Sequence, residues 1–195
     1  MRFVIVTTNK GKAEEFSSIF SKYGLRFRVE HMRTPEIQSE NLEEIAGHSV
    51  MYAYKTLREP VMVEDAGLFI DALNGFPGPY SSYVYRTLGV SGILRLMDGV
   101  VDREADFISV VAFYSPFTGL RIFGGKTEGL IAEEPKGVSG FGFDPIFIPR
   151  EGDGRTYAEM SVEEKSRVSH RGKAARKFAE WVKTLRDEEL PPPYR

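Results

Sequence analysis

The chain has no cysteine among its 195 residues. Disulfide bonds, thiolate metal sites and cysteine nucleophiles are therefore excluded. No apolar run approaches the roughly 20 residues that a membrane-spanning helix needs. The N-terminal sequence MRFVIVTTNKGK is too short, and too soon charged, for a secretory signal. We therefore expect a cytoplasmic protein without a membrane partner.

Neither sign of charge dominates, because 26 Lys and Arg residues oppose 28 Asp and Glu residues, giving a formal net charge of −2. Proteins that bind nucleic acid over a broad surface usually carry a strong positive excess, so we expect no nucleic-acid partner. Hydrophobic residues make up 42% and charged residues 28%, which is ordinary for a globular protein. The length suits a single domain spanning residues 1–195, with a flexible tail at 187–195.

The spacing of hydrophobic residues predicts alternating strands and helices, followed by a hairpin. Asn41 with Glu44 three residues later predicts a helix start, and Ser161 with Glu164 predicts a capping box. The sequence PFTG at 116–119 predicts the turn of the hairpin. This order predicts an α/β fold with a mixed, twisted sheet and flanking helices. Strands are expected at 3–7, 26–32, 61–63, 107–114 and 120–129, and helices at 11–23, 41–57, 80–97 and about 174–185.

The segment 7–12, with the sequence TTNKGK, is a predicted strand-to-helix turn. Such a turn presents free backbone N–H groups and the positive end of the helix dipole, which together bind phosphate. Lys12 would add a charge that reaches the β- or γ-phosphate. Taken alone, a polar surface turn that begins a helix explains the same residues.

Two adjacent carboxylates, Glu64 and Asp65, end a predicted buried strand. Carboxylates at this edge of a sheet can hold a metal ion or activate water. Side chains alternate along a strand, so one of the two is expected to enter a site, and Glu40 would supply a second oxygen ligand. The set suits Mg²⁺, which binds one or two carboxylates together with phosphate oxygens and water. The alternative is that Asp65 caps the turn toward Gly67.

The segment 140–145, with the sequence GFGFDP, is a second candidate for ligand binding. Glycine lets the backbone approach a ligand closely, and Phe141 or Phe143 offers a flat face for stacking on a base. Asp144 can accept hydrogen bonds from a base edge. A tight turn with a buried aromatic ring explains the segment as well, because glycine and aspartate are common turn residues.

A basic run begins at Lys165, and most of it fits a solvated helix face. Within it, Ser169, His170 and Arg171 place a hydroxyl, an imidazole and a guanidinium at one helix start. These groups can read a polar base edge or clamp a phosphate. A Ser-His-Asp hydrolase is not indicated, since the chain lacks a G-x-S-x-G elbow and neighbours in sequence do not form a triad.

Taken together and in this order, these clusters resemble the inosine triphosphate pyrophosphatase family. The resemblance covers nearly the whole chain, from Phe3 to about residue 186. Its most specific pieces are Thr7-x-Asn9-x-x-Lys12, Glu64-Asp65-x-Gly67-Leu68, Gly78-Pro79-Tyr80, Phe141-Gly142-Phe143-Asp144-Pro145 and Ser169-His170-Arg171.

The resemblance implies an elongated α/β fold with two lobes around a central cleft, and a homodimer. It also implies Mg²⁺-dependent hydrolysis of ITP, dITP and XTP to the nucleoside monophosphate and pyrophosphate. By matching position, Asp65 would be the base for the attacking water, and Glu40 and Asp65 would be the metal ligands. The residues implied for substrate binding are Thr7, Asn9, Lys12, Phe141, Phe143, Asp144, Lys165, Ser169, His170 and Arg171.

Two alternatives remain. A pyrophosphatase of the same architecture that acts on pyrimidine or methylated nucleotides would differ at the base-binding residues, where segments 141–144 and 169–171 favour purines. A non-catalytic nucleotide- or RNA-binding module would use the basic stretch 165–177. The presence of Glu40 and Asp65 and the negative net charge argue against that module.

Overall fold

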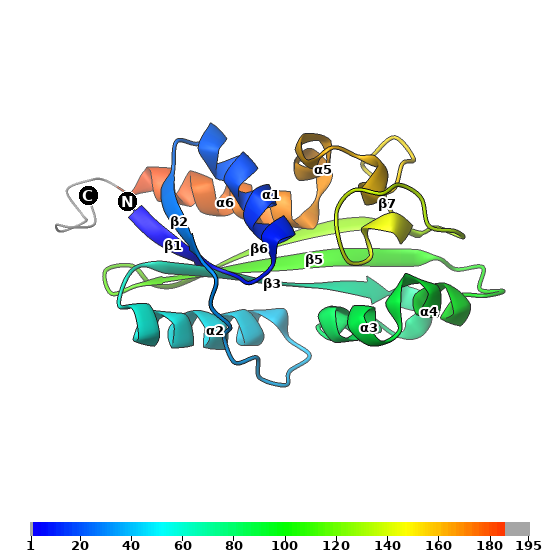
Figure 1. Ribbon diagram of the computed structural model, residues 1–195, viewed down its shortest axis with the longest axis horizontal. Coiled ribbons are helices and arrows are strands. Elements are labelled where there is room, and N and C mark those ends of the chain that lie inside the picture. Colours follow the sequence, from blue (N-terminus) through cyan, green and yellow to red (C-terminus); the bar gives the residue numbers. More distant parts are fainter. Residues whose placement is uncertain (1, 186–195) are drawn as a thin grey trace. The chain divides into compact units, whose positions relative to one another are not determined.

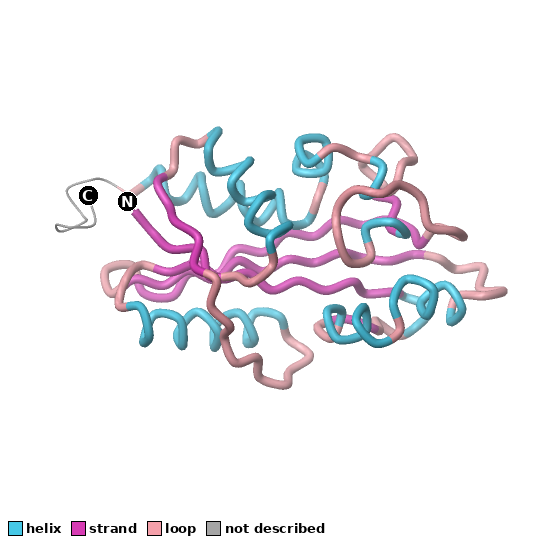
Figure 2. Tube along the Cα trace, viewed as in Figure 1, coloured by secondary structure: helices cyan, strands magenta, loops and turns pink. Residues whose placement is uncertain are grey.

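The computed structural model describes residues 2–185. The predicted flexible tail at 187–195 lies outside these residues. Figure 1 labels the elements, and Figure 2 shows their types. The strands are β1 (Arg2–Val6), β2 (Arg26–Glu30), β3 (Val61–Ile70), β4 (Pro77–Gly78), β5 (Glu104–Ser115), β6 (Gly119–Ile131) and β7 (Phe147–Pro149). The helices are α1 (Lys10–Lys22), α2 (Leu42–Leu57), α3 (Ser81–Thr87), α4 (Gly89–Leu96), α5 (Val162–Val168) and α6 (His170–Thr184), with short 3₁₀ helices η1 (Asp71–Leu73), η2 (Asp144–Ile146) and η3 (Tyr157–Glu159).

Within residues 2–185, seven strands form one mixed sheet. Its order is β2-β1-β3-β5-β6-β7, and the short β4 pairs with β3 outside this path. β1 runs parallel to both β2 and β3, with Val4 opposite Arg28 and Val61. β4 and β7 pair antiparallel with β3 and β6. The predicted α/β fold with a mixed sheet is confirmed.

The chain divides into two compact units. The first unit comprises the described residues of Met1–Asp65, Val110–Gly124 and Ala174–Arg195. The second unit comprises Ala66–Ser109 and Gly125–Lys173. The chain passes between the units inside β3, β5, β6 and α6, so neither unit is a continuous stretch of sequence.

The core of the first unit consists largely of aromatic rings packed between the sheet and helices α1 and α6. The buried positions of α1 include Phe16, Ile19 and Phe20, which follow helical spacing. The ring of Phe3 on β1 contacts Phe20 and also Phe178 of α6, with centroids 5.9 and 5.2 Å away. Helix α2 lies on the opposite face of the sheet (Figure 1). Both faces of this part of the sheet are therefore covered.

The second unit has its own core, built on β5, β7 and η3. The ring of Phe107 contacts Phe147 (centroids 4.8 Å apart) and Tyr157 (6.0 Å), and the latter two rings lie 5.0 Å apart. Ile93 of α4 and Ile70 of β3 are fully buried in the same cluster. These contacts fix η3 against the sheet.

The strand predicted at 61–63 is longer than expected, because β3 continues for seven residues beyond it. Glu64 and Asp65 therefore lie inside a strand, and the prediction that they end one was wrong. A Cβ at Gly67 would overlap with the carbonyl oxygen of Gly78, where β4 pairs with β3. The close approach of a neighbouring backbone, and not a turn, requires glycine at this position.

The single helix expected at 80–97 is two helices, α3 and α4. Gly89 has φ +67° directly after Leu88, the C-cap residue of α3. This is the position at which glycine commonly ends a helix, because it adopts the left-handed conformation without strain. The predicted hairpin is confirmed, with strands longer than expected. The predicted start of α2 is confirmed too, since the side chain of Asn41 caps it.

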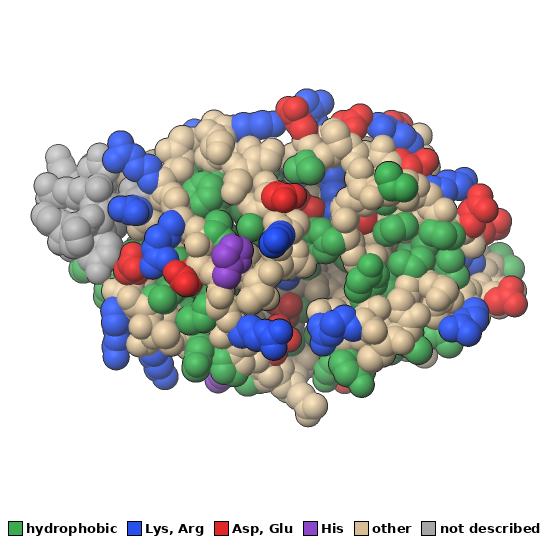
Figure 3. Space-filling view, viewed as in Figure 1, with side chains coloured by type: hydrophobic (Ala, Val, Ile, Leu, Met, Phe, Trp, Pro, Cys, Tyr) green, Lys and Arg blue, Asp and Glu red, His purple; other side chains and the backbone are tan. Residues whose placement is uncertain are grey.

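The surface agrees with the balanced composition. Figure 3 shows basic side chains in separate small groups, interspersed with acidic and hydrophobic ones, on the face in view. This face carries no broad basic area of the kind that binds nucleic acid. Among the described residues, no helix is long and apolar enough to span a membrane.

Arg103 joins the end of α4 to the end of β6. Its guanidinium donates to the carbonyl oxygens of Ile131 (2.6 Å), Ala132 (2.8 Å) and Met97 (3.1 Å). Arg103→Ala would deprive these carbonyls of a charged donor, so we expect the free energy of unfolding to fall by about 2–3 kcal/mol. Urea denaturation measures the change, with the exposed Arg95→Ala as the control. A loss no larger than that of the control would contradict the role given to Arg103.

Candidate active site

The turn between β1 and α1 is shaped by its own side chains. Asn9 is the N-cap of α1, and its side chain accepts a hydrogen bond from the N–H of Lys12 (3.1 Å). The hydroxyl of Thr7 accepts from the N–H of Asn9 (3.1 Å). The first turn of α1 has no acidic side chain, so no carboxylate of the helix itself offsets the positive end of its dipole. This end of α1 is suited to bind an anion such as phosphate.

Lys12 forms an ion pair with Glu64 of β3. Its Nζ lies 2.8 Å from the Oε2 atom of Glu64 and 3.2 Å from the main-chain oxygen of the same residue. The side chain of Glu64 is 1% exposed and that of Lys12 is 19% exposed. A buried carboxylate thus holds the ammonium group near the start of α1. The sequence indicated the acidic pair but not this contact, which joins residues 52 positions apart.

The two acidic residues predicted to bind metal lie in the same unit. Asp65 follows Glu64 on β3 and is partly buried, while Glu40 is exposed just before Asn41, the N-cap of α2. Among residues 2–185, no three side chains of His, Cys, Asp or Glu gather closely enough to hold a metal ion by themselves. Carboxylate oxygens fit an Mg²⁺ ion that takes its other ligands from phosphate and water. Both metal-ligand assignments stay predictions.

Asp144 and Lys165 form a buried ion pair in the second unit. The Oδ2 atom of Asp144 lies 2.6 Å from Nζ of Lys165, and each side chain is 4% exposed. The same oxygen accepts a hydrogen bond from the N–H of Phe141 (2.8 Å). Gly140 has φ +75°, and a Cβ there would overlap with this carboxylate. The loop therefore closes on the ion pair because residue 140 is glycine.

Two cations lie close to the ring of Phe141. The Nζ atom of Lys165 is 4.9 Å from the ring centroid, and the guanidinium carbon of Arg171 is 5.2 Å from it. Lys165 also lies 5.3 Å from the ring centroid of Tyr157. Arg171 and Lys165 are buried, whereas Phe141 is partly exposed. A ring with cationic donors beside it can stack on a base while the donors read polar atoms of that base.

Three other predicted site residues have contacts that support the fold. Phe143 is 3% exposed and belongs to the core of the second unit. The hydroxyl of Ser169 accepts from the N–H of Gly172 (3.1 Å) at the start of α6. The ring of His170 stacks on Phe107, with centroids 4.5 Å apart and planes inclined by 7°. Contact between these three side chains and substrate stays a prediction.

Tyr157 is a residue near this cluster that sequence reasoning missed. It is fully buried beside Lys165. A signal was present, because Thr156 and Glu159 have the spacing of a capping box. The structure confirms that box as well as the predicted one at Ser161.

The predicted site residues divide between the two units. Those proposed for phosphate, metal and water lie in the first unit, and those proposed mainly for the base lie in the second. The first set is Thr7, Asn9, Lys12, Glu40 and Asp65, and the second set is Phe141, Phe143, Asp144, Lys165, Ser169, His170 and Arg171.

The fold and these two clusters define an α/β protein with features suited to phosphate and to an aromatic ligand. The structure is similar to that of the Staphylococcus aureus Ham1 protein, with a TM-score of 0.80 and 30% identity over 94% of this chain and 99% of the other. It is also similar to a HAM1 protein from Coxiella burnetii, with a TM-score of 0.80 and 29% identity over 95% and 100% of the two chains.

The model of the Ham1 family matches residues 3–181, and the chain belongs to this family. A relative from Methanopyrus kandleri named dITP/XTP pyrophosphatase is 51% identical over 94% of this chain and 97% of its own length. A relative of the same name from Thermococcus kodakarensis is 49% identical over 94% and 98% of the two chains. The family predicted from the sequence is confirmed.

Proposed function

We propose that this chain is an enzyme that hydrolyses the non-standard purine nucleoside triphosphates ITP, dITP and XTP. The products are the nucleoside monophosphate and pyrophosphate, so the reaction removes these nucleotides from the nucleotide pool. The observation that carries the proposal is the 51% identity, over 94% of the chain, to a protein named dITP/XTP pyrophosphatase. The geometry of the two clusters supports the same reaction.

The start of α1 binds the triphosphate in this proposal. Its backbone N–H groups and helix dipole attract phosphate oxygens, and Lys12 adds an ammonium charge that Glu64 partly offsets. The ion pair with Glu64 holds that charge in place before substrate arrives. Less side-chain freedom is therefore lost when the nucleotide binds.

The proposed cofactor is Mg²⁺, with Glu40 and Asp65 as its protein ligands. When bound, the ion supplies positive charge that stabilises the phosphate oxygens and the leaving pyrophosphate. The donor set supports Mg²⁺, since the proposed ligands are carboxylates and the substrate brings phosphate oxygens.

The proposed reaction is an in-line attack of water on the α-phosphorus. The water oxygen bonds to the α-phosphorus while the bond between this phosphorus and the oxygen bridging the α- and β-phosphates breaks. Pyrophosphate leaves with the bridging oxygen. Asp65 orients the water and accepts its proton. Lys12 offsets the charge that develops on the leaving group. Positioning and charge stabilisation supply most of the acceleration.

The base would stack on Phe141, with Lys165 and Arg171 as donors toward its oxygen atoms. Hypoxanthine and xanthine both carry a 6-oxo group, which accepts hydrogen bonds. Adenine has an amino donor at that position, so a cationic donor would face another donor. Guanine keeps the 6-oxo group and adds a 2-amino group. Leaving polar groups unpaired can reject a base by roughly 1–3 kcal/mol.

The homodimer implied by the resemblance and the cytoplasmic location also stay predictions. Sedimentation velocity of the purified chain measures the first. A single species at the mass of one chain across micromolar concentrations would contradict the homodimer.

Pyrophosphate release from ITP, XTP, GTP, ATP and dTTP, with Mg²⁺ or with EDTA, tests the proposed function. We expect fast release from ITP and XTP with Mg²⁺, at least about tenfold slower release from GTP and ATP, and background release in EDTA. Equal release from all five nucleotides would contradict the base assignments but not the reaction. No release from any nucleotide that still binds would contradict the enzyme.

A further inference from the structure

The loop of residues 136–145, called the base loop below, is attached to the turn η3. The hydroxyl of Thr156 donates to the carbonyl oxygen of Lys136 (2.9 Å). The N–H of Ser139 donates to the carbonyl oxygen of Ala158 (3.0 Å). The position of the base loop therefore depends on where η3 lies.

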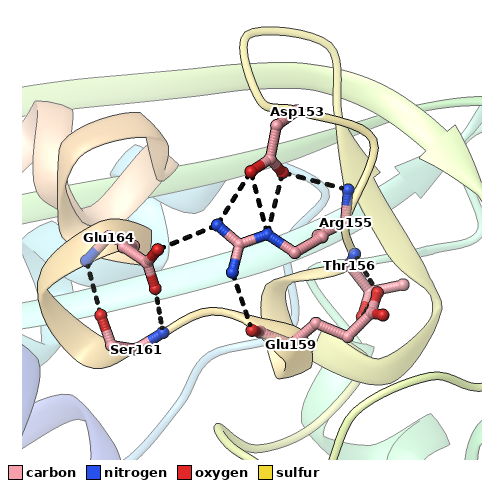
Figure 4. Close-up of polar contacts among 6 residues, drawn as sticks. All are labelled: Asp153, Arg155, Thr156, Glu159, Ser161 and Glu164. Atoms are coloured by element: carbon pink, nitrogen blue, oxygen red, sulfur yellow. Dashed lines mark hydrogen bonds and ion pairs between the residues drawn. The ribbon is translucent and has the colours of Figure 1, made fainter.

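Thr156 is in turn fixed by a capping box. It is fully buried, and its N–H donates to a carboxylate oxygen of Glu159 (2.7 Å). Figure 4 shows this box next to a second one, formed by Ser161 and Glu164 at the start of α5. Each box is a rigid local unit because it satisfies backbone N–H groups on both sides.

Arg155 joins the two capping boxes, as Figure 4 shows. Its Nη1 atom donates to the carbonyl oxygen of Glu159 (3.2 Å), and its Nη2 atom lies 2.9 Å from Oε1 of Glu164. Its Nε and Nη2 atoms also bind the carboxylate of Asp153, at 2.9 and 2.8 Å. The planar guanidinium serves three partners in fixed directions, which the single ammonium of a lysine cannot do.

Helix α5 also contacts the base loop, through Lys165. Lys165 follows Glu164 directly, and its ammonium group pairs with Asp144. The carboxylate of Asp144 accepts the N–H of Phe141 in the base loop. The base loop is therefore held at two places. It contacts η3 through Thr156 and α5 through Lys165, and Arg155 links η3 to α5.

We propose that Arg155 is a positioning residue for recognition of the base. It holds η3 and α5 together and so sets where Phe141 and Lys165 lie relative to each other. Its own side chain is 39% exposed and acts through these neighbours. The inference rests on the proposed function, because that function assigns Phe141 and Lys165 to the base.

The charges around Arg155 support its role at neutral pH. Its guanidinium is the main cause that lowers the pKa of Glu164 from 4.5 to about 2, and it also lowers the pKa of Asp153. A carboxylate with a depressed pKa stabilises the folded state above its unfolded pKa. For Glu164, this contribution is complete above about pH 4.5 and is lost as the pH falls toward 2. The carboxylates of Glu164 and Asp153 that contact Arg155 are therefore ionised at neutral pH.

The test compares Arg155→Ala with Arg150→Ala in steady-state kinetics with ITP and Mg²⁺. Arg150 is the control, because it is an arginine of the same unit whose acidic partner, Glu104, lies on β5 and outside the base loop, η3 and α5. We expect Arg155→Ala to raise KM about fivefold and to leave kcat within about twofold, while Arg150→Ala changes neither. The KM of Arg155→Lys should lie between those of the unaltered chain and Arg155→Ala, because lysine keeps the charge but lacks the several N–H donors of a guanidinium. An unchanged KM in Arg155→Ala, or an equal rise in the control, would overturn the proposal.

Hydrogen exchange of the base loop gives a second readout that does not require turnover. The N–H groups of Ser139 and Phe141 are hydrogen-bonded, and in Arg155→Ala we expect them to exchange several times faster than in Arg150→Ala. If these N–H groups exchanged at an unchanged rate in Arg155→Ala, or if exchange rose equally at N–H groups throughout both units, Arg155 would not position the base loop. If the unaltered chain releases no pyrophosphate from any nucleotide, the proposed function fails, and exchange still decides whether Arg155 holds the loop.

Discussion

Asp65→Asn is expected to lower kcat for ITP by about 10²–10⁴-fold while changing nucleotide affinity much less. Asparagine keeps the size of the side chain and one oxygen acceptor, but it cannot accept a proton from the attacking water. The loss therefore falls on the transition state more than on the bound substrate. Steady-state kinetics measure kcat, and equilibrium dialysis with a non-hydrolysable analogue measures affinity.

Two further variants sharpen this prediction. Asp71→Asn is the matched control, because Asp71 is exposed in η1 and lies outside the predicted site. Glu64→Gln is the contrast, since Glu64 holds Lys12 and its loss should raise KM more than it lowers kcat. Near-normal kcat in Asp65→Asn would contradict the role given to Asp65. If Glu64→Gln lowered kcat more than Asp65→Asn does, the role of base would belong to Glu64 instead.

Lys165→Met is expected to destabilise the protein by about 3–5 kcal/mol, because it removes the cation that lies 2.6 Å from the buried carboxylate of Asp144. At this chain length, that corresponds to a fall in Tm of roughly 6–20 °C. Binding of ITP should weaken as well, since the carboxylate also holds the N–H of Phe141. Chemical denaturation and calorimetry measure the change in stability.

The double variant Lys165→Met with Asp144→Asn separates charge from packing. Asparagine removes the buried charge but can still accept the N–H of Phe141, so we expect the double variant to recover part of the lost stability. Lys126→Met is the control, because its ion pair with Asp106 lies at the surface, and it should cost at most about 1 kcal/mol. A double variant less stable than Lys165→Met would contradict this account of the pair.

Features with local causes could be predicted from the sequence. The start of α2 at its Asn41 cap and the β5–β6 hairpin followed from residues only a few positions apart. The second capping box, at Ser161, did so too. The length of β3 could not be predicted in this way. Gly67 resembles a turn signal until β4 is placed against it, and only the folded chain brings Gly78 there.

For the site, the sequence determined the family and the residue types that bear chemistry, because motif order along the chain is itself a sequence property. The tertiary structure decided which of these residues meet. The partner of Lys12 is 52 positions away and that of Asp144 is 21 positions away. Burial also gave Phe143 and His170 core contacts that their motifs do not reveal. Local signals act over one or two turns of chain, whereas ion pairs and ring contacts depend on which elements pack together.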